Sequence, residues 1–81
     1  MNINEKFAEA RKQKGVSLRQ VQKDTGISNA YISQIETGKV KNIAPLFLKR
    51  LGTYYKIPLQ ELFILAGYAD VVTLQDVDAN E

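Results

Sequence analysis

The feature that most constrains the fold is the segment Leu18–Thr37, LRQVQKDTGISNAYISQIET, which has the pattern of two short helices separated by a glycine turn. Ser17 and Ser28 stand where the N-caps of the two helices would lie, and serine is a preferred N-cap. Gly26 lies between them, where a chain leaving a helix favours a residue that tolerates a positive φ. Apolar residues are spaced to meet across the angle between the two helices: Val21, Ile27, Ile32 and Ile35. The segment therefore predicts a helix-turn-helix.

The second helix of this motif carries small or neutral hydrogen-bonding side chains on its other face. Asn and Gln can bind adenine through two hydrogen bonds, and Ala or the methyl group of Thr can contact the thymine methyl. The alternative interpretation is an ordinary exposed helix face that is polar for solubility alone. The candidate base-reading residues are Asn29, Ala30, Ser33, Gln34 and Thr37.

The same stretch carries a family resemblance. The run GVSLRQVQKDTGISNAYISQIETGK resembles the phage-repressor (Cro/Xre-type, lambda-repressor-like) helix-turn-helix family, and YISQIETGK is its strongest mark. The resemblance extends from about Phe7 to Tyr68 and implies an all-α, compact five-helix domain that binds DNA as a transcriptional regulator, usually as a dimer. Two residues depart from the family pattern. Leu18 stands where members often have a Gln that touches phosphate and braces the reading helix, and Gln22 stands where they usually have Ala.

The resemblance also implies roles for residues around the motif. Family members commonly form a partly buried ion pair between an Arg of the first helix and a Glu before the loop glycine, which are Arg11 and Glu36 here. The alternatives for Arg11 are a solvated cation or a phosphate contact. The N-terminus of the first motif helix faces the DNA backbone in this family. The phosphate candidates are Arg19, Gln20, Ser28, Tyr31, Lys39, Lys41 and Asn42, with Tyr31 equally able to pack against the fourth helix. Lys12, Lys14 and Lys23 are weaker candidates.

Composition excludes several other kinds of protein. The 81 residues include no Cys and no His, so a disulfide framework, the usual zinc sites and a Ser-His-Asp triad are excluded, and we expect no cofactor or metal. No apolar run approaches the ~20 residues of a transmembrane helix, and the N-terminus lacks a signal-peptide core, which predicts a cytoplasmic, nucleoid-associated protein. All 11 Lys and Arg lie within residues 1–56, whereas residues 57–81 carry five of the nine acidic residues. This division suits contact with a polyanion, although charges that merely solvate the surface would look similar.

The remaining helices are predicted from caps and prolines. Asn4 can cap a first helix that ends near Lys14, Pro45 can open a fourth helix, and Pro58 can open a fifth that ends near Ala66. Leu48, Leu51 and Tyr55 recur at helical spacing as a core stripe of the fourth helix. Gly52 inside that helix costs ~1 kcal/mol relative to Ala, which predicts a close helix contact there. Residues 1–68 are thus expected to form the DNA-binding domain, and residues 69–81 an acidic tail or linker.

Three further residues are more apolar than the core stripe requires: Leu46, Phe47 and Ile64. They indicate either extra core or a self-association face, and a dimer would read half-sites about one helical turn apart. The leading hypothesis is a sequence-specific DNA-binding regulator, as a repressor, that binds an inverted-repeat operator in double-stranded DNA as a homodimer. The alternatives are an antitoxin that also binds a protein through its tail, and a protein-interaction module that kept only the helix-turn-helix shape. An enzyme is disfavoured because no nucleophile–base pair forms a recognisable motif.

Overall fold

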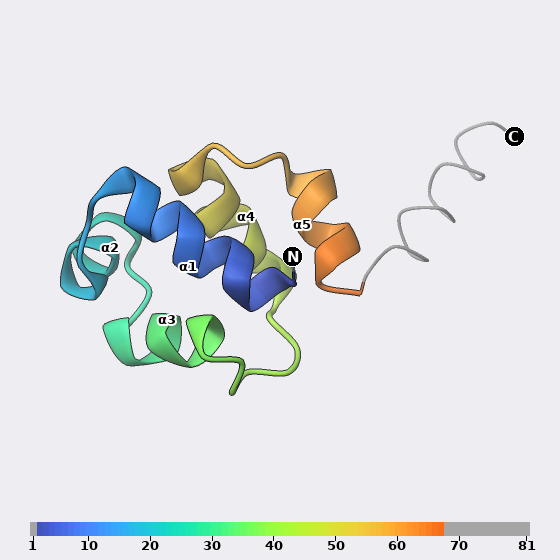
Figure 1. The fold of residues 1–81 in the computed structure, drawn as a ribbon, viewed down its shortest axis with the longest axis horizontal. Helices are drawn as coiled ribbons and strands as arrows, with labels where there is room; N and C mark the ends of the chain where they lie inside the picture. The colour runs from blue at the N-terminus through green and yellow to red at the C-terminus, as the bar shows by residue number, and fades with distance from the viewer. Residues whose placement is uncertain (1, 68–81) are drawn as a thin grey trace, which may run out of the picture.

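The computed structural model describes residues 2–67, and within that range it contains five α-helices and no strand (Figure 1). The expected all-α fold is confirmed, and the helices lie close to their expected bounds. The acidic tail expected at residues 69–81 lies outside the described residues. The helices are α1 (Ile3–Lys14), α2 (Leu18–Thr25), α3 (Asn29–Glu36), α4 (Pro45–Tyr55) and α5 (Leu59–Leu65).

The first three helices begin at side-chain caps, and one of these differs from the expectation. The cap of α1 is Asn2, whose Oδ1 accepts from the Glu5 N–H at 2.9 Å, so the prediction of Asn4 as the cap is wrong. Both asparagines satisfy the local rule for an N-cap, and a tertiary contact separates them. The side chain of Asn4 lies beside the turn at Gly38, where its Nδ2 is 3.3 Å from the position that a Cβ would take. Asn4 therefore faces the loop that follows α3.

The turn between α2 and α3 is held by hydrogen bonds on both of its sides. Gly26 has a φ of 80°, and its N–H donates to the Gln22 carbonyl at 2.8 Å, which ends α2. Thr25 Oγ1 donates to the Val21 carbonyl at 2.7 Å and accepts from the Ile27 N–H at 3.2 Å. These bonds satisfy the backbone groups that a helix end leaves without partners. Contacts within this short segment therefore help to fix the angle between α2 and α3.

All five helices contribute side chains to the core, and α2 and α5 lie at opposite ends of the molecule (Figure 1). Leu48 and Leu51 of the expected core stripe are buried, whereas Tyr55 is half-buried. Gly52 is also buried, and a Cβ there would lie 2.8 Å from Leu62 Cδ1, so the close contact predicted for this glycine is confirmed. The buried apolar side chains are Phe7, Val21, Ile27, Ile32, Ile35, Ile43, Leu48, Leu51 and Leu62.

Over residues 2–67, the helices are too short or too polar to cross a membrane.

Candidate nucleic-acid interface

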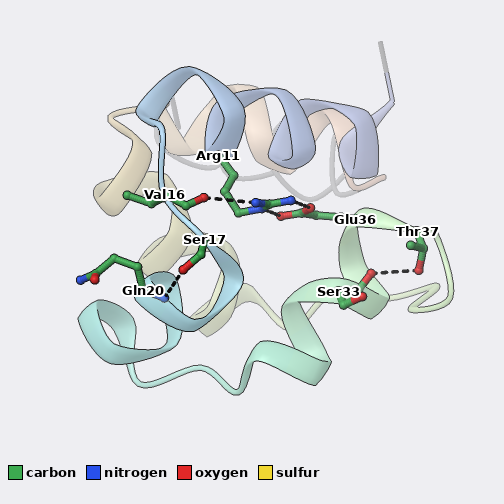
Figure 2. Close-up of polar contacts among 7 residues, drawn as sticks. All are labelled: Arg11, Val16, Ser17, Gln20, Ser33, Glu36 and Thr37. Atoms are coloured by element: carbon green, nitrogen blue, oxygen red, sulfur yellow. Dashed lines mark hydrogen bonds and ion pairs between the residues drawn. The ribbon is translucent and has the colours of Figure 1, made fainter.

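A bidentate ion pair joins α1 to the end of α3 (Figure 2). The guanidinium of Arg11 donates from Nε to Glu36 Oε2 at 2.8 Å and from Nη2 to Glu36 Oε1 at 3.0 Å. Its Nη1 donates to the Val16 carbonyl at 3.1 Å, so one side chain ties together α1, the loop before α2, and α3. The Glu36 side chain is only 8% exposed, and its hydrogen bonds raise the pKa of Arg11 above its ordinary value. Of the roles considered for Arg11, the structure has the ion pair, which sets the angle at which α3 projects.

The face of α3 opposite the core presents the five candidate base-reading residues. Ala30, Gln34 and Thr37 are exposed, whereas Asn29 and Ser33 are half-buried. Asn29 lies at the start of the helix and Thr37 is its C-cap, so the five residues span the whole of α3. The Thr37 hydroxyl donates to the Ser33 carbonyl at 2.9 Å (Figure 2), which leaves its methyl group as the natural contact with a base. The exposed face of α3 is polar, uncharged and of a size suited to a major groove.

A polar hollow of about 450 Å³ lies where the beginning of α2 meets the beginning of α3. Two cations, Arg19 and Lys23, line it, and both are exposed. Lys23 was one of the weaker candidates from sequence, and it lies one helical turn from Arg19 on α2. The hollow is lined by Ser17, Arg19, Gln20, Gln22, Lys23 and Asn29.

Two of the expected phosphate contacts already have partners within the protein. Gln20 donates from Nε2 to Asp24 Oδ1 at 2.8 Å, so its amide is directed along α2. Ser28 is the N-cap of α3, and its Oγ accepts from the Tyr31 N–H at 3.1 Å. Both side chains are exposed and can still form further hydrogen bonds. In this structure, however, each already stabilises a helix.

Asp24 also connects α2 to α4. The Tyr54 hydroxyl donates to Asp24 Oδ2 at 2.6 Å, and this bond, helped by Gln20, lowers the pKa of Asp24. Burial and the same bond raise the pKa of Tyr54 to about 12. The Lys14 ammonium lies 4.7 Å from the centre of the Tyr54 ring, so this lysine is engaged away from the hollow.

The loop between α3 and α4 carries the remaining phosphate candidates. Lys39, Lys41 and Asn42 are all exposed there. The next residue, Ile43, is 3% exposed and belongs to the core, which anchors the loop directly behind them. Cations therefore lie beyond both ends of the candidate reading face of α3, at Arg19 and Lys23 near its start and at Lys39 and Lys41 after its end.

Of the two roles considered for Tyr31, the structure shows the packing one. Its ring is 5.1 Å from the ring of Phe47 on α4, and both side chains are half-buried against the core. Of the three residues that indicated either extra core or a self-association face, Phe47 is therefore packed at the edge of the core. The sequence could not separate these roles, because helical spacing does not say which neighbour an aromatic ring will meet.

The other two residues of the expected self-association face are exposed, and they line different hollows. Leu46 is 58% exposed on α4 and lines a hollow with residues of α2 and α4. Ile64 is 52% exposed on α5 and lines a different hollow with residues of its own helix and Pro58.

The two departures from the family pattern have different environments. Leu18 is half-buried and packs against the core. Gln22 is exposed, and its Oε1 accepts from the Asn29 N–H at 2.7 Å, across the turn. Gln22 was not among the site residues predicted from the sequence, where its only signal was that it stands in place of a smaller residue at a close helix approach. Across residues 2–67, no group of three or more His, Cys, Asp or Glu side chains could hold a metal ion.

Comparison with known proteins matches the chain to one family model, and three of the relatives that it finds are helix-turn-helix transcriptional regulators. The helix-turn-helix family HTH_3 matches residues 7–62. The transcriptional regulator SlrR of Bacillus subtilis (strain 168) is 40% identical over 53 residues, which cover 65% of this chain and 35% of that protein. From the same organism, the transcriptional repressor RghR is 32% identical over 71 residues, covering 88% of this chain and 53% of the repressor. The uncharacterized regulator RghRB is 30% identical over 79 residues, covering 98% of this chain and 57% of that protein. The chain thus spans about a third to somewhat more than half of these relatives, and no solved structure matches it significantly.

Proposed function

The chain belongs to the helix-turn-helix family of transcriptional regulators, and from this premise we propose that it is a sequence-specific repressor that reads DNA with α3. The observation that carries the proposal is the exposed face of α3, which is polar and uncharged between two pairs of cations. Uncharged hydrogen-bonding groups discriminate base edges, whereas cations bind every phosphate alike. This distribution is what a reading helix in a major groove requires.

The same geometry assigns base reading and phosphate binding to different residues. Gln34 and Asn29 are the strongest base readers, since each can make two hydrogen bonds with an adenine. Arg19 and Lys23 on one side, with Lys39 and Lys41 on the other, bind the sugar–phosphate backbone and make affinity dependent on salt. The Arg11–Glu36 ion pair holds α3 at the docking angle without touching DNA.

Repression and dimerisation extend this proposal. One relative carries the name of a transcriptional repressor, which supports repression as the mode of action. A homodimer on an inverted repeat would double the contacts and place its half-sites about one helical turn apart. The exposed side chains of Leu46 and Ile64 are available for such an association, which would take place in the cytoplasm at the nucleoid.

The test is selection of bound duplexes from a random DNA pool, followed by measurement of the affinity for the selected duplex at two salt concentrations. We expect an enriched inverted repeat and an affinity that falls steeply as salt is raised. An enriched single half-site would keep the DNA-reading function and remove the dimer. No enrichment, with weak binding at both salts, would contradict the proposal and favour the antitoxin-like or protein-interaction alternatives.

A further inference from the structure

Gln22 of α2 bridges the two helices of the motif. Its Oε1 accepts from the Asn29 N–H at 2.7 Å, seven residues further along the chain. Asn29 is the first residue of α3, so its N–H has no partner within the helix. Ser28 caps the Tyr31 N–H in the same turn, and Gln22 supplies a second acceptor from the neighbouring helix. The start of the reading helix is thus fixed by a side chain of α2.

This contact also determines where the other end of the Gln22 amide points. A backbone N–H can only donate, so the oxygen must face α3 and the Nε2 amino group must face away from it. Within residues 2–67, Nε2 makes no hydrogen bond, and the Gln22 side chain is exposed. Two N–H donors therefore remain for a ligand outside the protein.

The surroundings of Nε2 indicate the chemistry of that ligand. Gln22 lines the polar hollow together with Arg19 and Lys23, and the hollow holds no acidic residue. Asn29, the first candidate base reader, lines the same hollow. An anion is the ligand that two cations and a pair of amide N–H donors would hold together. On DNA, an anion at the edge of the reading helix is a backbone phosphate.

We propose that Gln22 is a positioning residue that fixes the start of α3 through Oε1 and, through Nε2, donates to a DNA phosphate held between Arg19 and Lys23. This inference rests on the proposed function, since it requires that α3 reads DNA. It makes the register of the reading helix depend on one neutral side chain that connects the phosphate backbone with the first residue of α3. The same residue departs from the family pattern, where a smaller Ala stands.

Two substitutions at this position separate its two ends. Gln22→Met keeps the length of the side chain and removes both the acceptor and the donor. Gln22→Glu keeps an acceptor for the Asn29 N–H and adds a negative charge near the N-terminus of α3, which stabilises a helix. It has no donor for a phosphate. Gln13→Met is the matched control, since Gln13 is an exposed glutamine of α1 that does not line this hollow.

The experiment measures the melting temperature of each variant and its affinity for the duplex that the parent chain selects. We expect Gln22→Met to bind about ten- to a hundredfold more weakly, with an unchanged slope of log affinity against log salt because no charge is removed. Arg19→Met should lower that slope. Gln22→Glu should melt at or above the parent's temperature and bind at least as weakly as Gln22→Met, whereas Gln13→Met should match the parent in both measurements.

A scan of the selected duplex with single methylphosphonate substitutions gives the readout that a purely structural role would not move. At one phosphate, neutralisation should cost the parent more affinity than it costs Gln22→Met. Equal costs at every phosphate, or parent-like binding by Gln22→Glu, would overturn the phosphate contact and leave only the cap. Parent-like binding by a folded Gln22→Met would overturn the whole inference while the proposed function stands. If the parent selects no duplex, the proposed function fails and this inference fails with it.

Discussion

The α2–α3 pair and the α4–α5 pair are each two short helices joined by a tight connection, but different forces hold them. In the first pair both helices start at serine caps, and an ion pair and a cross-turn hydrogen bond fix α3. In the second pair neither helix has a side-chain cap hydrogen bond, and each starts at a proline. There, Gly52 allows Leu62 of α5 to approach the backbone of α4 closely.

The two helix pairs differ in the kind of contact that each one needs. Hydrogen bonds and ion pairs are directional, so they fix the angle at which a helix presents its exposed face. Apolar packing has no such direction, and it suffices where the requirement is to close the core. The pair that presents the candidate reading face is the one with directional contacts. Perturbations of the two pairs should accordingly differ in kind.

The largest expected effect comes from breaking the ion pair at α3. Glu36→Ala leaves the Arg11 guanidinium without its carboxylate partner in a part-buried site, which should cost about 3 kcal/mol of the free energy of unfolding. Denaturant unfolding measures this cost. Glu9→Ala is the control, since Glu9 is exposed on α1 and accepts a hydrogen bond from the exposed Gln13, and it should change stability by less than about 0.5 kcal/mol. Equal costs for the two variants would show that the ion pair does not hold α3.

The second expected effect is a loss of base discrimination by the exposed face of α3. Gln34→Ala removes an exposed amide that can pair with adenine, and we expect it to lose about 1–3 kcal/mol of discrimination at one base position. Competition binding with duplexes changed at single positions measures this loss. Lys39→Ala is the contrast, since it should weaken binding to all sequences alike and lower the salt slope by about one. If both variants lost affinity uniformly, Gln34 would be a backbone contact and not a base reader.

The extent to which these features follow from sequence also differs between the two pairs. The serine caps, Gly26 and the prolines are local signals, so they predicted the helices correctly. The choice of Asn2 over Asn4 as the first cap depended on the loop at Gly38, which is remote in sequence. Phe47 was ambiguous for the same reason, since its burial depends on the ring of Tyr31. The bridging contact of Gln22 needed the angle between two helices, and no pattern of residue types encodes it.

The third effect tests packing in the α4–α5 pair. Gly52→Ala would place a Cβ 2.8 Å from Leu62 Cδ1 and 3.1 Å from the Ile57 carbonyl oxygen, and the fully buried Leu62 has little room to move. Overpacking costs about 1–3 kcal/mol, from which the better helix propensity of Ala recovers about 1 kcal/mol. We expect a net loss of about 1 kcal/mol in the free energy of unfolding.

Thr53→Ala is the control for this substitution, because Thr53 is the next residue of α4 and is exposed. It should leave stability within about 0.5 kcal/mol of the parent. In addition, Leu62→Val should reduce the cost of Gly52→Ala, since the two residues share one contact. A Gly52→Ala variant as stable as the parent would mean that α5 can shift, and that this pair is held less tightly than its packing indicates.

The smallest effect concerns the hydrogen bond between Tyr54 and Asp24, which connects the two pairs. Because the pKa of Tyr54 is raised from 10.0 to about 12, its contribution to stability is complete below pH 10 and is lost as the pH rises toward 12. Because the pKa of Asp24 is lowered, its contribution is present above 3.8 and is lost as the pH falls below that value. Tyr54→Phe removes the bond, so its free energy of unfolding should depend less on pH than the parent's in both ranges.

Denaturant unfolding near neutral pH and in both of those ranges checks this, with Tyr31→Phe as the control for loss of a tyrosine hydroxyl. The half-buried Tyr55, whose pKa burial also raises, remains in the parent and in the variant, so the comparison between the two reports the loss of the Tyr54 hydroxyl. A pH dependence identical to the parent's would mean that this bond adds nothing to docking α4 on α2. The α2–α3 pair would then be held against α4 by apolar contacts. The hydrogen bonds and ion pairs that stabilise the position of α3 would come from α1, α2 and α3 themselves.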